Sequence, residues 1–366
     1  MANINDVAKH AGVSPTTAKR AIRTPELLRP ETLKRVRAAI EALHYEPDML
    51  ASALRSGQSR SVGLMVGSIV EPFFAELIRT IGKVVRTKGY TLLVAENDYD
   101  TELELEGLRE FQGHRISGLI IRSGYGEPNL NYLKRMQKRG TAIVEIDYFY
   151  PDSPFSHVML DNRACIFEGV EYLASLGHTR IAALGSYHAM VQSDERVQAF
   201  PEAMNHYGLE LPEVYEGALR PTQAEAYRFT HHLMTLPTPP TALLAITGSM
   251  AIGTFRALRE LGLRVPQDVS LLSFDNYPWT ELVEPPIDVI EQPAVEMGKM
   301  AVDVLLRQMN NPSEVTRERF SGKLIRRGSC TPPKEEGRRK KEEERSKIED
   351  RRSVGQVKGQ RSKVSK

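Results

Sequence analysis

Apolar residues follow two different spacings along the chain. From Ser61 onward, short runs of consecutive apolar residues alternate with segments in which apolar residues recur every three or four positions. The runs are typical of strands buried on both faces, and the periodic segments are typical of amphipathic helices. Strands are predicted over 62–69, 90–95, 118–121, 141–146, 157–160, 180–184, 241–247, 269–274 and 288–291. Helices are predicted near 73–88, 102–112, 129–138, 162–176, 194–207, 223–236, 249–262 and 293–309.

The alternation of strands and helices predicts an α/β body with parallel sheets. Nine strands are many for one sheet, so we predict two lobes within residues 61–330. One lobe would comprise about 61–160 plus 288–330, and the other 161–287. Ligands of such folds bind at the carboxyl ends of the strands, so a binding cleft is expected between the lobes.

Residues 1–46 show helical spacing alone and predict an all-α head. A first helix ends at Gly12, which can adopt the left-handed conformation that a tight turn needs. Ser14 followed by Pro15 is typical of the N-cap and first residue of a second helix, and a third helix begins near Pro30. Two helices joined by a glycine-containing turn predict a helix-turn-helix, although any small helical hairpin would share this pattern.

Two further segments predict little stable structure. Residues 47–60 form a linker with one short helix, N-capped by Asp48 and ended at Gly57. A helix of about eight residues is marginal alone in water. Residues 331–366 are rich in charge and carry few aliphatic side chains, so we predict a disordered tail.

Composition and charge limit the class of protein. The 366 residues are 41% hydrophobic and 26% charged, as in soluble globular proteins. No apolar run reaches the length of a membrane span and no signal-peptide pattern begins the chain, so we expect a cytoplasmic protein without membrane contact. Lysine and arginine outnumber acidic residues by ten to six in residues 1–60 and by thirteen to seven in residues 334–366, whereas the remaining body is acidic. Basic ends favour nucleic acid as a partner, although charge runs are often only solvated surface.

The sequence lacks the motifs that mark common enzymes. It has no Gly-x-Gly-x-x-Gly after a strand, no Walker loop, no Gly-x-Ser-x-Gly and no His-Glu-x-x-His. Its two cysteines, Cys165 and Cys330, cannot form a disulfide framework or a four-ligand zinc site. We therefore predict a protein without enzymatic activity, metal or cofactor.

Several motifs together resemble one known family. From about Asn3 to Ser329, the chain resembles the LacI/GalR family of bacterial transcriptional regulators. The matching segments are INDVAKHAGVS at 4–14, LRSG at 54–57, EPFFAE at 71–76, GHTRIA at 177–182, and GLRVPQDVS at 262–270, which runs into FDN at 274–276.

The resemblance implies a homodimer whose two helix-turn-helix heads bind a pseudo-palindromic operator in double-stranded DNA, placing the protein at the nucleoid. Two-fold protein symmetry then imposes an inverted repeat on the DNA. By the family's motif, Pro15, Thr16 and Arg20 contact bases, and Arg20 has the geometry to pair with guanine. Thr17 and Lys19 are expected to contact phosphates.

The same resemblance implies that the linker is a hinge helix that folds on the operator. Leu54 would enter a minor-groove step as a wedge and kink the DNA, with Arg55 beside it as a further DNA contact. Packing of Leu54 on the body is the alternative.

The body is similar to the family's effector domain, which is of the periplasmic-binding-protein type. Aromatic faces stack on sugar or base rings, and carboxylate and guanidinium groups bond hydroxyls. Thr247-Gly248 stands where the family commonly has Asn-Asp, and Arg220 is expected near the mouth of the cleft, so either the effector differs from a neutral sugar, for example by being acidic, or the pocket has diverged. The predicted effector-binding residues are Phe73, Phe74, Asp147, Arg196, Arg220, Thr247 and Asp275.

The resulting hypothesis is an effector-controlled repressor of a carbohydrate-uptake or catabolic operon. A transcriptional activator of the same family would have the same residues, because the position of the operator decides the outcome. A cytoplasmic solute-binding protein would share the body but would not need a basic head. A two-lobed enzyme would need a nucleophile or a cofactor loop.

Overall fold

The computed structural model describes residues 2–45, 59–125, 129–150, 152–185, 195–215 and 221–334. Of the predicted site residues, Leu54, Arg55 and Arg220 lie outside this part of the chain. Most of the predicted linker and the charged tail from residue 335 onward also lie outside it.

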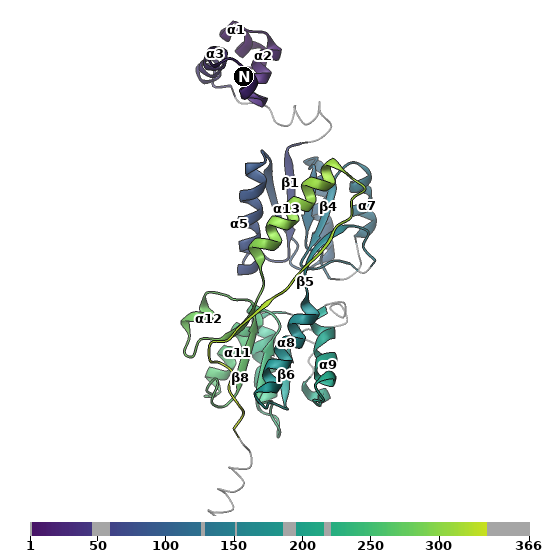
Figure 1. Cartoon of the computed structure of the whole chain (residues 1–366), viewed down its shortest axis with the longest axis vertical. Coiled ribbons are helices and arrows are strands. Elements are labelled where there is room, and N and C mark those ends of the chain that lie inside the picture. Colours follow the sequence, from purple (N-terminus) through teal and green to yellow (C-terminus); the bar gives the residue numbers. More distant parts are fainter. Residues whose placement is uncertain are drawn as a thin grey trace, which may run out of the picture.

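The head consists of α1 (Ile4–Ala11), α2 (Pro15–Arg23), a 3₁₀ turn (Pro25–Leu27) and α3 (Pro30–Ala42), drawn in purple in Figure 1. The predicted helix-turn-helix is confirmed. Gly12 has a φ of 62° in the turn, and the hydroxyl of Ser14 accepts from the backbone N–H of Thr17 at 3.1 Å, which caps α2. Small apolar side chains let the three helices pack closely around a core of Val7, Ala8, Ala11, Ala18, Ala21, Val36 and Ala39.

The first lobe contains a six-stranded sheet in the order β10-β5-β4-β3-β1-β2, in which every pairing is parallel. Helices α5 and α13 cover one face, and α6 and α7 cover the other, each over its own apolar cluster. The elements are β1 (Ser61–Val66), α5 (Pro72–Thr87), β2 (Thr91–Glu96), α6 (Thr101–Gly113), β3 (Gly118–Ile121), α7 (Leu130–Lys138), β4 (Ala142–Ile146), β5 (Ser156–Leu160), α13 (Ala294–Asn310) and β10 (Arg317–Phe320).

The second lobe contains a five-stranded sheet in the order β11-β9-β8-β7-β6, parallel except for the antiparallel edge pair β11–β9. Helix α8 packs against α9, and α10 packs against α11. The elements are α8 (Asn162–Ser175), β6 (Ile181–Leu184), α9 (Glu195–His206), a 3₁₀ turn (Glu213–Tyr215), α10 (Gln223–Met234), β7 (Ala242–Ala245), α11 (Gly248–Glu260), β8 (Ser270–Phe274), α12 (Trp279–Leu282), β9 (Asp288–Glu291) and β11 (Lys323–Ile325).

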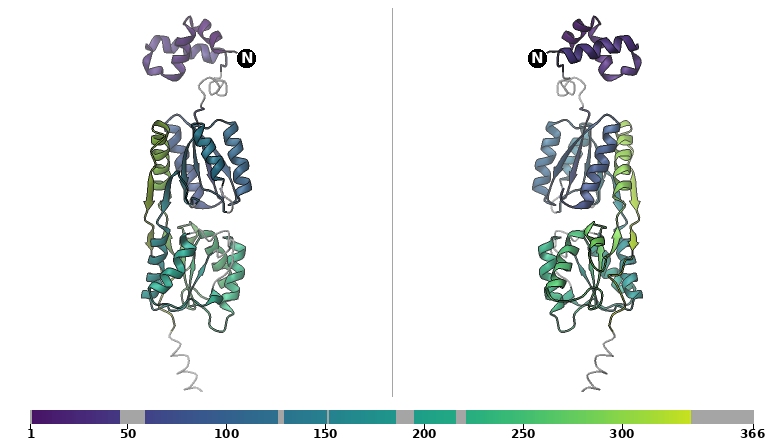
Figure 2. Two further views of the ribbon diagram at one scale, coloured as in Figure 1. Left: turned by 90° about the vertical axis from the view of Figure 1, so that its right-hand side faces the viewer. Right: turned by 90° about the vertical axis from the view of Figure 1, so that its left-hand side faces the viewer.

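The two lobes are joined by three stretches of chain. These connect β5 to α8, β9 to α13, and β10 to β11, and they run along one side of the molecule (Figure 1 and Figure 2). A Cβ atom at Gly322, between β10 and β11, would lie 2.6 Å from the sulfur of Cys165, so the chain passes close to α8 there. The parallel strands of each sheet have their carboxyl ends on the side that faces the other lobe, so the strand ends of the two lobes lie opposite each other.

The assignment of residues 288–330 to the first lobe is wrong for two strands. Only α13 and β10 join the first sheet, whereas β9 and β11 belong to the second. The apolar pattern of a short strand records burial but not which sheet the strand enters. The polar edge strands β10 and β11 were not predicted, because RERF at 317–320 alternates between exposed and half-buried positions and carries almost no apolar signal.

Among the described residues, no helix is long and apolar enough to span a membrane. These residues also hold no cluster of three or more histidine, cysteine, aspartate or glutamate side chains that could ligate a metal ion.

The contact between α10 and α11 depends on a glycine. A Cβ atom at Gly253 would lie 2.0 Å from the backbone oxygen of Gln223, so Gly253→Ala must push the helices apart. We expect a loss of about 1–3 kcal/mol of unfolding free energy, as for other overpacked sites. Gly113→Ala is the control, since nothing lies within 4 Å of its Cβ position, and it should be neutral or stabilising by up to about 1 kcal/mol. Denaturant unfolding of both variants checks this; equal stability would contradict it.

Candidate functional site

A cavity of about 310 Å³ lies between the two lobes, where strands of both sheets end. Its walls combine aromatic rings with charged side chains. Six of the seven residues predicted to bind an effector line it, and the seventh, Arg220, lies outside the described residues. The six are Phe73, Phe74, Asp147, Arg196, Thr247 and Asp275.

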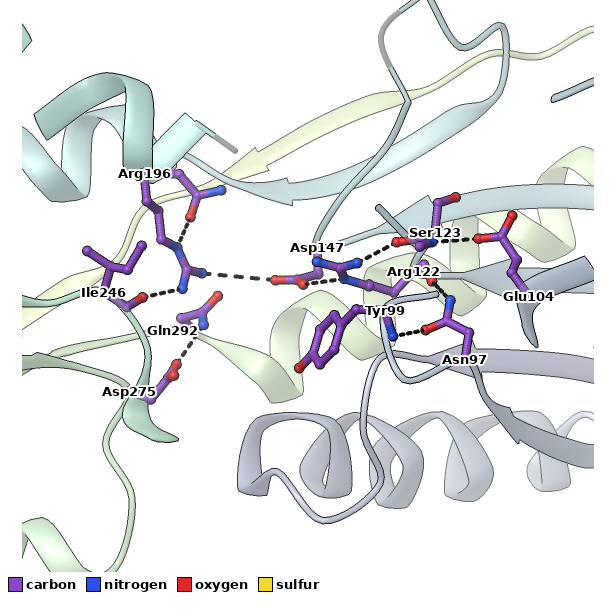
Figure 3. Close-up of polar contacts among 12 residues, drawn as sticks. Asn97, Tyr99, Glu104, Arg122, Ser123, Asp147, Arg196, Ile246, Asp275 and Gln292 are labelled. Carbon is purple, nitrogen blue, oxygen red and sulfur yellow. Dashed lines mark hydrogen bonds and ion pairs between the residues drawn. The ribbon is translucent and has the colours of Figure 1, made fainter. Parts of the chain in front are cut away.

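The carboxylate of Asp147 lies between two arginines that come from different lobes (Figure 3). Asp147 follows β4 directly and adopts a φ of 67°. Its Oδ2 is 3.5 Å from Nε of Arg122, which follows β3, and its Oδ1 is 4.0 Å from Nη2 of Arg196 at the start of α9. All three side chains are at most 14% exposed, so the attraction is weakly screened by solvent. This charge group connects the lobes across the cavity.

Aromatic rings surround the guanidinium of Arg122. Its central carbon lies 4.6 Å from the ring centroid of Tyr99, 4.2 Å from that of Tyr125 and 4.9 Å from that of Tyr148. Rings at these distances stabilise a cation through their negative faces. The rings come from three separate loops of the first lobe, so Arg122 packs these loops against one another at the cavity.

Arg196 is fixed by the second lobe. Its Nε donates to Oδ1 of Asn162 at 2.7 Å, and its Nη1 donates to the carbonyl of Ile246 at 2.9 Å. The guanidinium also lies 4.3 Å from the ring centroid of Phe274. These contacts set the position of a guanidinium that reaches across to Asp147.

Asp275 forms part of the wall at the start of α11. It follows β8, has a φ of 67°, and its Oδ2 accepts from the backbone N–H of Gly248 at 3.0 Å. Its Oδ1 accepts from Nε2 of Gln292 at 2.6 Å. The hydroxyl of Thr247 caps the same helix by accepting from the N–H of Met250 at 3.2 Å. Unpaired N–H groups at a helix start favour a carboxylate there.

Glu71 is a further acid in the cavity, directly before α5. Burial, and after it the nearby carboxylate of Asp275, raise the pKa of Glu71 from 4.5 to about 7, although a hydrogen bond from Tyr99 opposes this shift. Oε1 of Glu71 also accepts from the hydroxyl of Ser249 at 3.4 Å, which is a second contact between the lobes. Next to Glu71, the rings of Phe73 and Phe74 meet edge to face at 5.1 Å.

The sequence interpretation missed several cavity residues. Glu71 lies inside a quoted motif, and Arg122 directly follows a predicted strand, so the rule that ligands bind at strand ends could have found Arg122. Tyr99 and Tyr125 lie in loops and carry no such signal. The residues that were missed are Glu71, Tyr99, Arg122, Tyr125, Tyr148, Phe149, Met159, Asn162, Glu195, Gln198, Pro221, Ile246 and Gln292.

In the head, the residues predicted to contact DNA lie on or near one exposed surface of α2. Pro15, Thr16, Lys19 and Arg20 are exposed. Thr17 is half-buried, and its hydroxyl is 2.9 Å from that of Ser14, so it takes part in the cap of the helix. If Thr17 contacts a phosphate, its hydroxyl would have to bond both the phosphate and Ser14.

Comparison with known proteins covers nearly all of the described chain. Residues 3–48 match the family model of bacterial regulatory proteins, lacI family, and residues 170–330 match the periplasmic binding protein-like domain. The HTH-type transcriptional repressor PurR of Photorhabdus laumondii is 33% identical over 321 residues, which cover 86% of this chain and 92% of that protein. The ribose operon repressor of Escherichia coli K12 is 28% identical over 333 residues, 90% of this chain and all of that protein.

A solved structure of another transcriptional regulator has the same fold. The complex of the transcriptional regulator CelR with cellobiose superposes with a TM-score of 0.66 at 25% identity, and covers 90% of this chain and 100% of that one. These relatives are regulators rather than enzymes.

Because Glu71 is a buried acid, we expect the stability of the folded protein to depend on the pH at which this acid ionises. Because its pKa is raised in the folded protein, the folded state favours the protonated acid, and the cost of burying the charge appears as pH rises from 4.5 through about 7. Glu71→Gln should therefore raise the melting temperature at pH 8 and change it little at pH 5.

Glu76→Gln, one turn along α5, is the matched control. Hydrogen bonding to Arg79 lowers the pKa of Glu76, so the folded state favours its charged form, and loss of that charge should stabilise the protein at neither pH. A lower melting temperature of Glu71→Gln at pH 8 would show that its charge is not a cost.

Proposed function

Because this chain belongs to the LacI family of bacterial regulatory proteins, DNA-binding transcriptional repressors controlled by a small effector, we propose that a carbohydrate in the cavity between the lobes controls its binding to an operator. The observation that carries this proposal is the cavity itself. Aromatic rings and an ion-paired set of carboxylates and guanidiniums from both lobes line it, which suits a ring bearing hydroxyl groups.

In the proposed complex, Phe73 stacks on the apolar face of the sugar ring, with Phe74 supporting it from behind. Asp147, Arg196 and Asp275 bond its hydroxyls, with Thr247 at the edge. Because Asp147 and Arg196 come from different lobes, a sugar bonded to both favours one arrangement of the lobes over others. A ligand shifts such an equilibrium only by its difference in affinity for the two arrangements.

The DNA-binding part is residues 1–46, followed by a hinge at 47–60 and the two-lobed body at 61–330. We propose that Pro15, Thr16 and Arg20 contact bases and that Thr17 and Lys19 contact phosphates. In the hinge, Leu54 acts as a minor-groove wedge with Arg55 beside it.

We also propose that two copies act together on a pseudo-palindromic operator. Exposed side chains on the second lobe support this, since Leu282 at the end of α12 is 83% exposed and a groove starting at Trp279 of the same helix combines apolar with charged side chains. The groove is lined by Ile252, Phe255, Arg256, Arg259, Glu260 and Trp279. Association through it would bring two heads to one operator, because a two-fold dimer matches an inverted repeat.

The other functions considered have less support. The head, α1 to α3, has no role in a plain solute-binding protein. We propose that the body carries no catalysis, since its relatives are regulators and Asp147 at the cavity is held by Arg122 and Arg196 as in a binding site. Activation of transcription differs only in operator position. Binding to the chromosome places the protein in the cytoplasm, at the nucleoid.

The carbohydrate proposal is tested with a panel of monosaccharides and disaccharides. An effector that binds the folded protein should stabilise it by about 2.7 kcal/mol at 100 times its Kd, and the melting temperature should rise accordingly. The same effector should change operator affinity in a gel-shift assay. Arg196→Ala should abolish both effects. Arg163→Ala should preserve them, because Arg163 pairs with Glu202 in solvent. A panel that yields neither effect would refute a carbohydrate effector.

The DNA-contact proposal separates base contacts from phosphate contacts. Arg20→Ala should cost about 1–3 kcal/mol per half-site and relax the preference at one symmetric base pair. Lys19→Ala, the matched control on the same helix, should weaken all sequences alike and reduce the slope of log affinity against log salt by about 1. Binding-site selection with both variants measures this. Unchanged base preference in Arg20→Ala would contradict the assigned contact.

A further inference from the structure

The charged residues that line the cavity are mostly acids. Two arginines face four acids, and the arginines are committed to the protein by the contacts described above. Asp147 lies between both arginines, and Glu195 pairs with Arg319 at 2.7 Å. The four acids are Glu71, Asp147, Glu195 and Asp275.

Glu71 and Asp275 differ from the other two acids. Within the described part of the chain, neither forms an ion pair with a lysine or an arginine. The partners found for them are neutral: a tyrosine and a serine hydroxyl for Glu71, and a backbone N–H and the Gln292 amide for Asp275. The two neighbouring carboxylates repel each other in a medium that screens poorly, and the attraction of Arg122 for Glu71 is weaker than this repulsion.

A neutral acceptor lies at the same end of the cavity. Gln292 is 8% exposed and lines the cavity, and its Nε2 is used by Asp275. Its Oε1 is buried and has no hydrogen-bond partner within the described structure. A buried acceptor without a partner carries the cost of lost hydration, which a ligand donor would remove. This end of the cavity therefore offers acceptors and negative charge to a ligand.

We propose that the effector carries a protonated amino group that binds between Glu71 and the Asp275–Gln292 pair, which makes amino sugars the ligand class of this cleft. The inference rests on the proposed function, because it assumes a carbohydrate effector. An ammonium group has three donors and one positive charge, so it can donate to Oε1 of Gln292 and to a carboxylate while it reduces the repulsion between the two acids. A hydroxyl group supplies one donor and no charge.

Two other features agree with a cation at this position. Burial and the proximity of Asp275 raise the pKa of Glu71, and a bound ammonium reverses the second cause. The acidic effector considered from the sequence would instead add negative charge beside Glu71 and Asp275. The guanidinium of Arg196 has Nε and Nη1 bonded to Asn162 and Ile246, so an acidic group would meet only its Nη2, which already faces Asp147.

The test compares matched sugars on the full chain at pH 7. Each pair has an amine and its neutral parent: D-glucosamine with D-glucose, D-galactosamine with D-galactose, and D-mannosamine with D-mannose. Thermal shift detects binding and titration calorimetry gives Kd. We expect at least one amine to bind tenfold or more tightly than its parent sugar. This comparison needs no variant.

Glu71→Gln keeps the shape of the side chain and removes its charge. It should weaken binding of the preferred amine at least tenfold and leave the Kd of the parent sugar within about twofold. Glu76→Gln should leave both Kd values unchanged, because Glu76 pairs with Arg79 outside the cavity. Equal losses for the amine and its parent in Glu71→Gln would overturn the role of its charge.

The outcomes separate this inference from the proposed function. A neutral sugar that binds as tightly as its amine overturns the amine proposal and leaves the carbohydrate-controlled repressor in place. If none of the three amines binds, the amine proposal fails, and the wider sugar panel with the operator assay then decides the proposed function separately.

Discussion

The cleft depends on the charge group of Asp147, Arg122 and Arg196. Asp147 and Arg122 leave adjacent parallel strands of the first sheet, and Arg196 begins a helix of the second lobe. Removing three charges from water is costly unless each is paired and hydrogen-bonded. The tyrosine rings around Arg122, and Asn162 with the carbonyl of Ile246 around Arg196, provide that compensation. The same group spans the two lobes, so the lining of the cavity and the contact between the lobes share these three side chains.

Within the described residues, an ion pair and a hydrogen bond both cross the cavity. The Asp147–Arg196 pair is at 4.0 Å, and the hydroxyl of Ser249 is 3.4 Å from Glu71. Both are long, and neither belongs to the covalent crossings at the side of the molecule. A ligand that inserts between these groups can replace long contacts with shorter ones, which is how binding energy becomes a preference for one arrangement of the lobes.

The cavity also contains polar groups whose burial is unfavourable as long as no ligand bonds to them. Glu71 is protonated in part at neutral pH because of burial, and Oε1 of Gln292 lacks a partner in the described structure. The strands of both lobes are mostly apolar, but Glu145 in β4 shares these features, because burial raises its pKa to about 7 and one of its carboxylate oxygens lacks a partner in the described structure. Buried polar groups of this kind are expected at a binding site, because they lower the stability of the free protein and bond to the ligand when it binds.

The sequence by itself determined the local structure: the helix starts at Ser14 and Pro15, the alternation of strands and helices, and the strand ends that carry Asp147 and Asp275. These follow from backbone preferences and apolar periodicity, which act over a few residues. Only the tertiary structure decided that β9 and β11 join the second sheet, that rings from distant loops enclose Arg122, and that Glu71 lies near Asp275. These contacts join residues far apart in the chain, and they depend on strand order and on how two separately folded lobes meet, which the periodicity of neither lobe encodes.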